Sequence, residues 1–110
     1  MITWPLFAEQ FFNEKLVVEI LSIGVPIGVG VPVRWGDEER VGVLVNKDAV
    51  KKAVSMLMDC GEEGENRRKR AAKLGEMATK SMEFGGSSYL NLTLLIQDIM
   101  HMQQQSEETS

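Results

Sequence analysis

The chain has 110 residues, of which 44% are hydrophobic and 25% charged, the composition of a globular protein with one modest core. Its net charge of −4 disfavours a nucleic-acid partner, because binding phosphates depends on clustered positive charge. No apolar run approaches the roughly 18 residues that cross a bilayer, so we expect no membrane partner. A single cysteine cannot form an internal disulfide and the first residues do not resemble a signal peptide, so we expect a cytoplasmic protein.

The first third of the chain predicts a strand, a helix and a second strand. Residues 2–5 have the character of the end of a buried strand, and residues 6–21 carry apolar pairs at the i, i+4 spacing of a helix. In the stretch VPIGVGVPV, hydrophobic residues alternate with proline and glycine, and the prolines limit the second strand to residues 27–31. This order predicts two parallel strands joined by a right-handed crossover. Because parallel strands are normally covered on both faces, it indicates part of a larger α/β domain.

Three further helices are predicted. Asn46 has the position of an N-cap for a helix that ends near residues 60–61. The third helix would place Ala71, Gly75, Ala78 and Met82 on its inner face, and its basic run at residues 67–70 is interpreted as a solvated face. Ser87 or Ser88 would cap a fourth helix that carries Leu92, Ile96, Ile99 and Met100, followed by a disordered tail at residues 103–110.

The junction between the first strand and its helix is the candidate site. Ligands of open α/β sheets bind at the carboxyl ends of the strands, which here is Trp4-Pro5, and Glu9 and Gln10 follow at the start of the helix. A carboxylate at this point would repel a phosphate, but with the amide it would suit a neutral ligand rich in hydroxyl groups, such as a sugar. The alternative is a solvated glutamate that the helix dipole alone favours.

The stretch TWPLFAEQFFNEKLVV resembles the end of the signature box of plant secondary-product UDP-glycosyltransferases, family-one enzymes of the GT-B fold. Trp4, Pro5, Glu9, Gln10 and Asn13 match that ending. The following strand, loop and helices are also similar to the family, including the Gly-Gly-Ser-Ser turn. The resemblance implies an α/β fold class: a partial Rossmann-like unit, in which residues 1–102 form the C-terminal part of a nucleotide-sugar donor-binding domain.

The resemblance also implies a function, namely transfer of glucose from UDP-glucose to a hydroxyl of a small plant metabolite, with inversion and without a metal or other cofactor. Glu9 and Gln10 would hold the hydroxyls of the donor sugar. Trp4 and Pro5 would support the pocket wall, and Asn13 would bond backbone near the helix start. The family's catalytic histidine and its aspartate lie in a preceding domain, so no catalytic residue is assigned here.

The implied partners are the UDP-sugar, the acceptor and the rest of the enzyme chain, which we expect to be needed for stability. By itself the 110-residue chain is expected to be inactive. The alternative is a non-catalytic truncated paralogue or partner-binding fragment; Met1 falls inside the expected strand, which favours an incomplete sequence. An unrelated nucleotide-binding module would need a phosphate loop, and GVGVP lacks the required glycine spacing. His101 is interpreted as a solvated helical residue.

Overall fold

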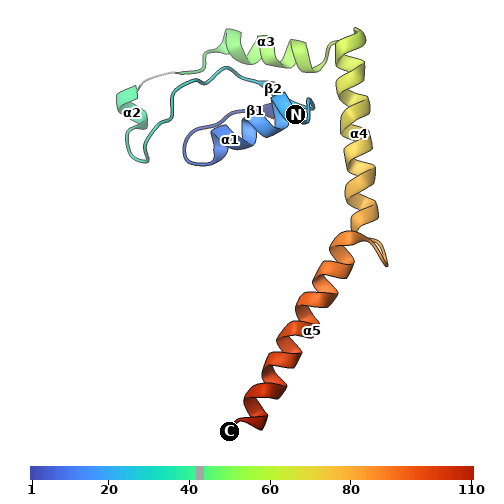
Figure 1. Cartoon of the computed structure of the whole chain (residues 1–110). Coiled ribbons are helices and arrows are strands. Elements are labelled where there is room, and N and C mark those ends of the chain that lie inside the picture. The colour runs from blue at the N-terminus through green and yellow to red at the C-terminus, as the bar shows by residue number, and fades with distance from the viewer. Residues whose placement is uncertain (42–43) are drawn as a thin grey trace. The chain divides into compact units, whose positions relative to one another are not determined.

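The computed structural model describes residues 1–41 and 44–110 (Figure 1). The chain divides into two compact units, Met1–Ala72 and Lys73–Ser110. The boundary between them falls within one long helix, α4 (Glu62–Met82). The candidate site lies entirely in the first unit.

The first unit opens with the predicted strand–helix–strand order. Strand β1 (Ile2–Thr3) is followed by α1 (Gln10–Lys15), which continues as a π-helical turn η1 (Leu16–Ile20), and then by β2 (Val25–Pro26). The two strands pair in parallel, with Ile2 opposite Val25 and Thr3 opposite Pro26. The predicted parallel pair is therefore confirmed.

The predicted position of the second strand, residues 27–31, is wrong. The pairing continues only as far as the amide of Ile27, which donates to the carbonyl of Thr3 at 3.0 Å. Strand β1 ends at Thr3, Pro5 just beyond it has no N–H to offer, and Gly28 turns the chain with φ +104°. Of the five alternating hydrophobic residues, Val25, Ile27, Val29 and Val33 are buried, whereas Val31 is 58% exposed.

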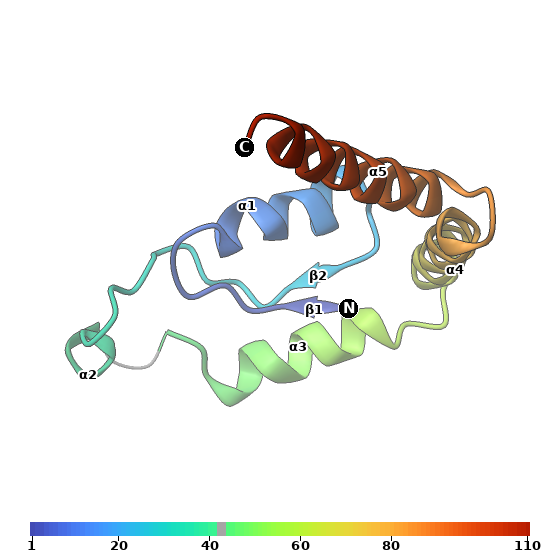
Figure 2. The same cartoon turned by 90° about the horizontal axis from the view of Figure 1, so that it is seen from below.

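Helices α1 and α3 (Lys47–Leu57) lie on opposite sides of the two strands (Figure 2). The core between α3 and the strands consists of Val25, Ile27, Val29 and Ala53. Asn46 caps α3 as predicted, because its side-chain oxygen accepts a hydrogen bond of 2.9 Å from the amide of Ala49. Ahead of this helix, the polar loop contains a short helix, α2 (Glu38–Val41).

The predicted solvated basic face of α4 is confirmed only in part: Arg68 and Lys69 are exposed, and Arg67 forms an i, i+4 ion pair with Glu63. Three arginines also bind backbone carbonyls, so the ends of two other elements are held by α4. The bonds are Arg67 to Met56 (3.1 Å), Arg68 to Leu57 (3.4 Å) and Asp59 (2.9 Å), and Arg70 to Ser22 (2.8 Å). We call Arg67, Arg68 and Arg70 the arginine clasp.

A buried glycine permits this close approach. A side chain at Gly64 would collide with the carbonyl oxygen of Asp59, so only glycine lets α4 begin directly against the end of α3. By contrast, the described residues do not cover the predicted inner face of α4, whose four residues are all exposed: Ala71, Gly75, Ala78 and Met82.

The second unit contains the last part of α4 and the helix α5 (Ser87–Glu108). The turn between them uses Gly85 at φ +81°, and Gly86 is the N-cap of α5, in place of the predicted Ser87 or Ser88. Phe84 and Tyr89 pack beside this turn with ring centroids 5.2 Å apart. The helix continues through Glu108, into the segment expected to be disordered, since glutamine and glutamate are adequate helix formers.

Within the described residues, no helix combines the length and apolar character needed to cross a membrane.

Candidate functional site

A hollow of about 240 Å³ lies at the junction of β1 and α1. One wall is the strand, from Met1 to Pro5, and the other is the helix face. The lining comprises Met1, Ile2, Thr3, Trp4, Pro5, Gln10, Asn13, Glu14 and Val17. Four residues that the sequence singled out are thus brought together around one space: Trp4, Pro5, Gln10 and Asn13.

Gln10 makes the decisive local contacts of this junction. Its side-chain oxygen accepts hydrogen bonds from the backbone amides of Leu6, at 2.7 Å, and Phe7, at 3.4 Å. The acceptor half of the amide is therefore used to hold the turn between strand and helix. The NH₂ group is the half that can donate to a ligand in the hollow.

The turn that Gln10 holds is strained. Ala8 has φ +54°, in the left-handed region that residues other than glycine seldom adopt. Such a conformation persists only where the surrounding contacts determine it, and it occurs often at ligand sites. The side-chain oxygen of Gln10 contributes two such contacts, and backbone bonds from Gln10 to the carbonyl of Phe7, at 3.3 Å, and from Val33 to the carbonyl of Leu6, at 2.8 Å, add to them.

Glu9 and Asn13 occupy different positions at this junction. Glu9 is exposed at the N-cap position of α1, makes no capping bond through its side chain, and lies outside the lining of the hollow as the described residues form it. Asn13 lines the hollow, and its backbone N–H donates to the carbonyl of Glu9 at 3.0 Å, an ordinary helical bond. Among the described residues, no hydrogen bond joins the Asn13 side chain to backbone, so its predicted role stays a prediction. Trp4 is 54% exposed, whereas Pro5 is buried.

Sequence reasoning missed one contact in this hollow. The hydroxyl of Thr3 donates to a carboxylate oxygen of Glu14 at 2.5 Å, joining the strand to the helix, and both side chains are half-buried. A Thr in a strand and a Glu eleven residues later give no recognisable pattern. Their proximity follows only from the way the helix folds back along the strand.

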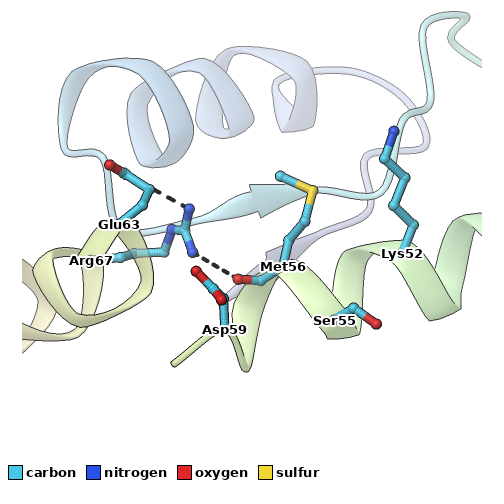
Figure 3. A pocket seen from close by; sticks show the side chains of 6 residues that line it. All are labelled: Lys52, Ser55, Met56, Asp59, Glu63 and Arg67. Atoms are coloured by element: carbon cyan, nitrogen blue, oxygen red, sulfur yellow. Dashed lines mark hydrogen bonds and ion pairs between the residues drawn. The ribbon is translucent and has the colours of Figure 1, made fainter. Parts of the chain in front are cut away.

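A second hollow of about 330 Å³ lies between α3 and the first turns of α4 (Figure 3). It is lined by Lys52, Ser55, Met56, Asp59, Glu63 and Arg67. Arg67 of the clasp spans it, with an ion pair of 4.0 Å to Glu63 and the bond to the Met56 carbonyl. Its charges are of both signs and its arginine is already bonded, so this hollow is a less suitable ligand site than the first.

The structure places His101 on the exposed surface of α5, as predicted. Among the described residues, no group of three or more His, Cys, Asp or Glu side chains is placed to hold a metal ion.

Comparison with known proteins gives the family. UDP-glycosyltransferase 73C25 of Barbarea vulgaris is 57% identical over 104 residues, which cover 94% of this chain and 21% of that protein. UDP-glycosyltransferase 73D1 of Arabidopsis thaliana is 56% identical over 110 residues, covering 91% of this chain and 22% of that protein. The chain belongs to the plant family-one UDP-glycosyltransferases. No protein-family model matches it.

A solved plant UDP-glycosyltransferase gives the fold. The crystal structure of UGT73P12 from Glycyrrhiza uralensis, complexed with glycyrrhetinic acid 3-O-monoglucuronide, matches 98% of this chain and 22% of that one, with a TM-score of 0.87 and 41% identity. The match is to the C-terminal region of a GT-B enzyme, which confirms the predicted fold class. The chain spans about one fifth of the length of these relatives.

Proposed function

We propose that this chain forms part of the donor-binding domain of an enzyme that transfers glucose from UDP-glucose to a hydroxyl of a small plant metabolite. In this proposal residues 1–102 belong to that domain. The relatives are named as glycosyltransferases, and one of them, 56% identical over 97 residues, is anthocyanidin 3-O-glucosyltransferase 4 of Manihot esculenta. Its name supports glucose as the donor sugar.

The observation that carries the proposal is the junction hollow with Gln10 in its wall. A sugar presents several hydroxyl groups, each of which can accept a hydrogen bond from an amide NH₂ group. Gln10 has that group available, since its oxygen is bonded to Leu6 and Phe7. The hollow of about 240 Å³ has room for a hexose ring beside Trp4 and Pro5.

Glu9 completes the proposed sugar site from outside the hollow. Its carboxylate is exposed and makes no capping bond, so it can accept hydrogen bonds from two adjacent hydroxyls of a sugar. Asn13 supports the helix start from within the lining. The general base, the uracil contact and the diphosphate contact are assigned to other parts of the enzyme, so the 110-residue chain alone is expected to transfer no glucose.

The test uses a chimera in which this chain replaces the matching 104 residues of UDP-glycosyltransferase 73C25. Two substitutions separate the two halves of the Gln10 amide. Gln10→Glu keeps an oxygen that accepts from Leu6 and Phe7 but removes the NH₂ donor, whereas Gln10→Ala removes both. We expect Gln10→Glu to raise KM for UDP-glucose by about tenfold, the effect of one lost hydrogen bond to a polar ligand, and to leave KM for the acceptor unchanged.

Gln10→Ala should show the same loss together with a lower melting temperature, because the strained turn loses its contacts. If Gln10→Glu keeps the full kcat/KM for UDP-glucose, the sugar-contact role of Gln10 is wrong. The isolated 110-residue chain is tested beside the chimera. Transfer of glucose by these 110 residues alone would contradict their expected inactivity.

A further inference from the structure

We propose that Thr3 and Glu14 are positioning residues of the junction hollow. Their hydrogen bond fixes the distance and angle at which α1 presents Gln10 to the end of β1. Neither residue is assigned to touch the sugar, so both act through Gln10. This inference rests on the proposed function of the hollow as a sugar site.

The hollow needs such a tie because its two walls are separate elements. The strand wall, from Met1 to Pro5, and the helix wall are connected along the chain only by the turn of residues 6–9. That turn contains the strained Ala8 and would relax if it were not held. Gln10 holds the turn itself, whereas Thr3 and Glu14 join the walls beyond it, about one helical turn further along α1.

Apolar packing gives α1 little anchorage. None of its six residues, all of which the structure describes, is buried. Phe11 is partly buried against the core, and Phe12 is 77% exposed. The continuation η1 is anchored by Val17 and Val18, which lie against Gly24, so polar contacts matter most at the first turns of the helix.

The hydroxyl of Thr3 donates to a carboxylate oxygen of Glu14 at 2.5 Å, and a carboxylate is a good acceptor for a hydroxyl. Both side chains are half-buried, so water competes only partly for them. Loss of this bond should let α1 move relative to Trp4 and Pro5.

The first experiment measures that movement in the 110-residue chain itself. Thr3→Val removes the hydroxyl at nearly constant shape, and Thr3→Ser is the matched control that keeps it. We expect the amide of Leu6, which is bonded to Gln10, to exchange its hydrogen about tenfold faster in Thr3→Val and unchanged in Thr3→Ser. Equal exchange in the two variants would overturn the proposal.

The second experiment measures the consequence in the chimera. Thr3→Val should raise KM for UDP-glucose about fivefold with kcat nearly constant, and Thr3→Ser should restore it. In the double variant with Gln10→Glu, Thr3→Val should raise KM for UDP-glucose by less than it does alone. The reason is that Thr3 acts through the NH₂ group of Gln10, which Gln10→Glu has already removed. Glu14→Gln, whose side-chain oxygen still accepts from Thr3, is the second variant. It should raise KM for UDP-glucose less than Glu14→Ala does.

The outcomes separate this inference from the proposed function. If Gln10→Glu raises KM for UDP-glucose and Thr3→Val does not, the sugar site remains and the positioning role is wrong. Additive effects of the two substitutions would also overturn the positioning role. If neither substitution changes KM, the sugar site itself is misplaced and the positioning role fails with it.

Discussion

Gln10 and Asn46 show how one amide side chain can fix the start of a helix in two different ways. Asn46 precedes its helix and accepts a bond from the amide of Ala49, three residues ahead. Gln10 is the first residue of its helix and accepts bonds from Leu6 and Phe7, which lie behind it. The first arrangement is a common N-cap with a known sequence signature, whereas the second depends on the path of a strained turn.

At Asn46, we expect Asn46→Ala to lower the free energy of unfolding of the first unit by about 1 kcal/mol, the usual cost of a lost N-cap. Asn46→Asp, which keeps an oxygen acceptor, is the matched control. It should change the free energy of unfolding by only a few tenths of the effect of Asn46→Ala. Urea denaturation followed by circular dichroism measures both. Equal midpoints for the two variants would show that the cap contributes nothing.

The residue scale also shows where sequence reasoning succeeds and where it stops. The cap at Asn46 was predicted, and the alternation at residues 25–33 marks four positions that are buried, because both follow from neighbours within a few residues. The role of Gln10 in the turn was not predicted, because its partners become partners only when Ala8 adopts a left-handed conformation.

At the scale of elements, the arginine clasp is the main finding that the sequence concealed. A run of basic residues on a helix is usually solvated, and nothing in the run indicates backbone carbonyls as partners. Arg70 reaches the carbonyl of Ser22, 48 residues earlier, just beyond the end of η1, where Ser22 has φ +54°. Only the folded unit brings that carbonyl within reach, so the contact is tertiary in origin.

We expect Arg70→Ala to destabilise the first unit by about 1 kcal/mol, a value reduced from that of a buried charged hydrogen bond because the Arg70 side chain is 37% exposed. The amide of Ile23, which bonds the carbonyl of Val17 beside this turn, should exchange faster. The matched control is Lys69→Ala, because Lys69 is exposed on the same helix.

Hydrogen exchange followed by mass spectrometry measures this difference. If Arg70→Ala and Lys69→Ala give the same exchange at Ile23 and the same stability, the bond to Ser22 does not hold the turn.

At the scale of the whole molecule, the main feature is the number of apolar helix side chains that are exposed. On α5, four apolar residues are about half exposed: Leu92 55%, Ile96 51%, Ile99 46% and Met100 57%. At the end of α3, Val54 and Met58 are 44% and 67% exposed. The periodicity identified apolar helix faces correctly, but a pattern cannot tell which faces the described residues themselves cover.

We expect the 110-residue chain to associate in solution, because apolar surface of this extent drives contact between copies. Sedimentation velocity over a hundredfold range of concentration should give a mass that rises above 12.3 kDa. The double substitution Ile96→Lys and Ile99→Glu should weaken association without loss of stability, since both side chains are exposed. A constant mass of one chain at every concentration would contradict this expectation.

The clasp and the buried Gly64 together constrain how this segment can evolve. Each residue added to a helix rotates everything beyond it by about 100°. One residue inserted between Gly64 and Arg67 would therefore turn the three guanidinium groups away from their carbonyls. Among descendants of this sequence, insertions and deletions should be rare from Asp59 to Arg70 and should collect beyond Gln103, where α5 is exposed throughout.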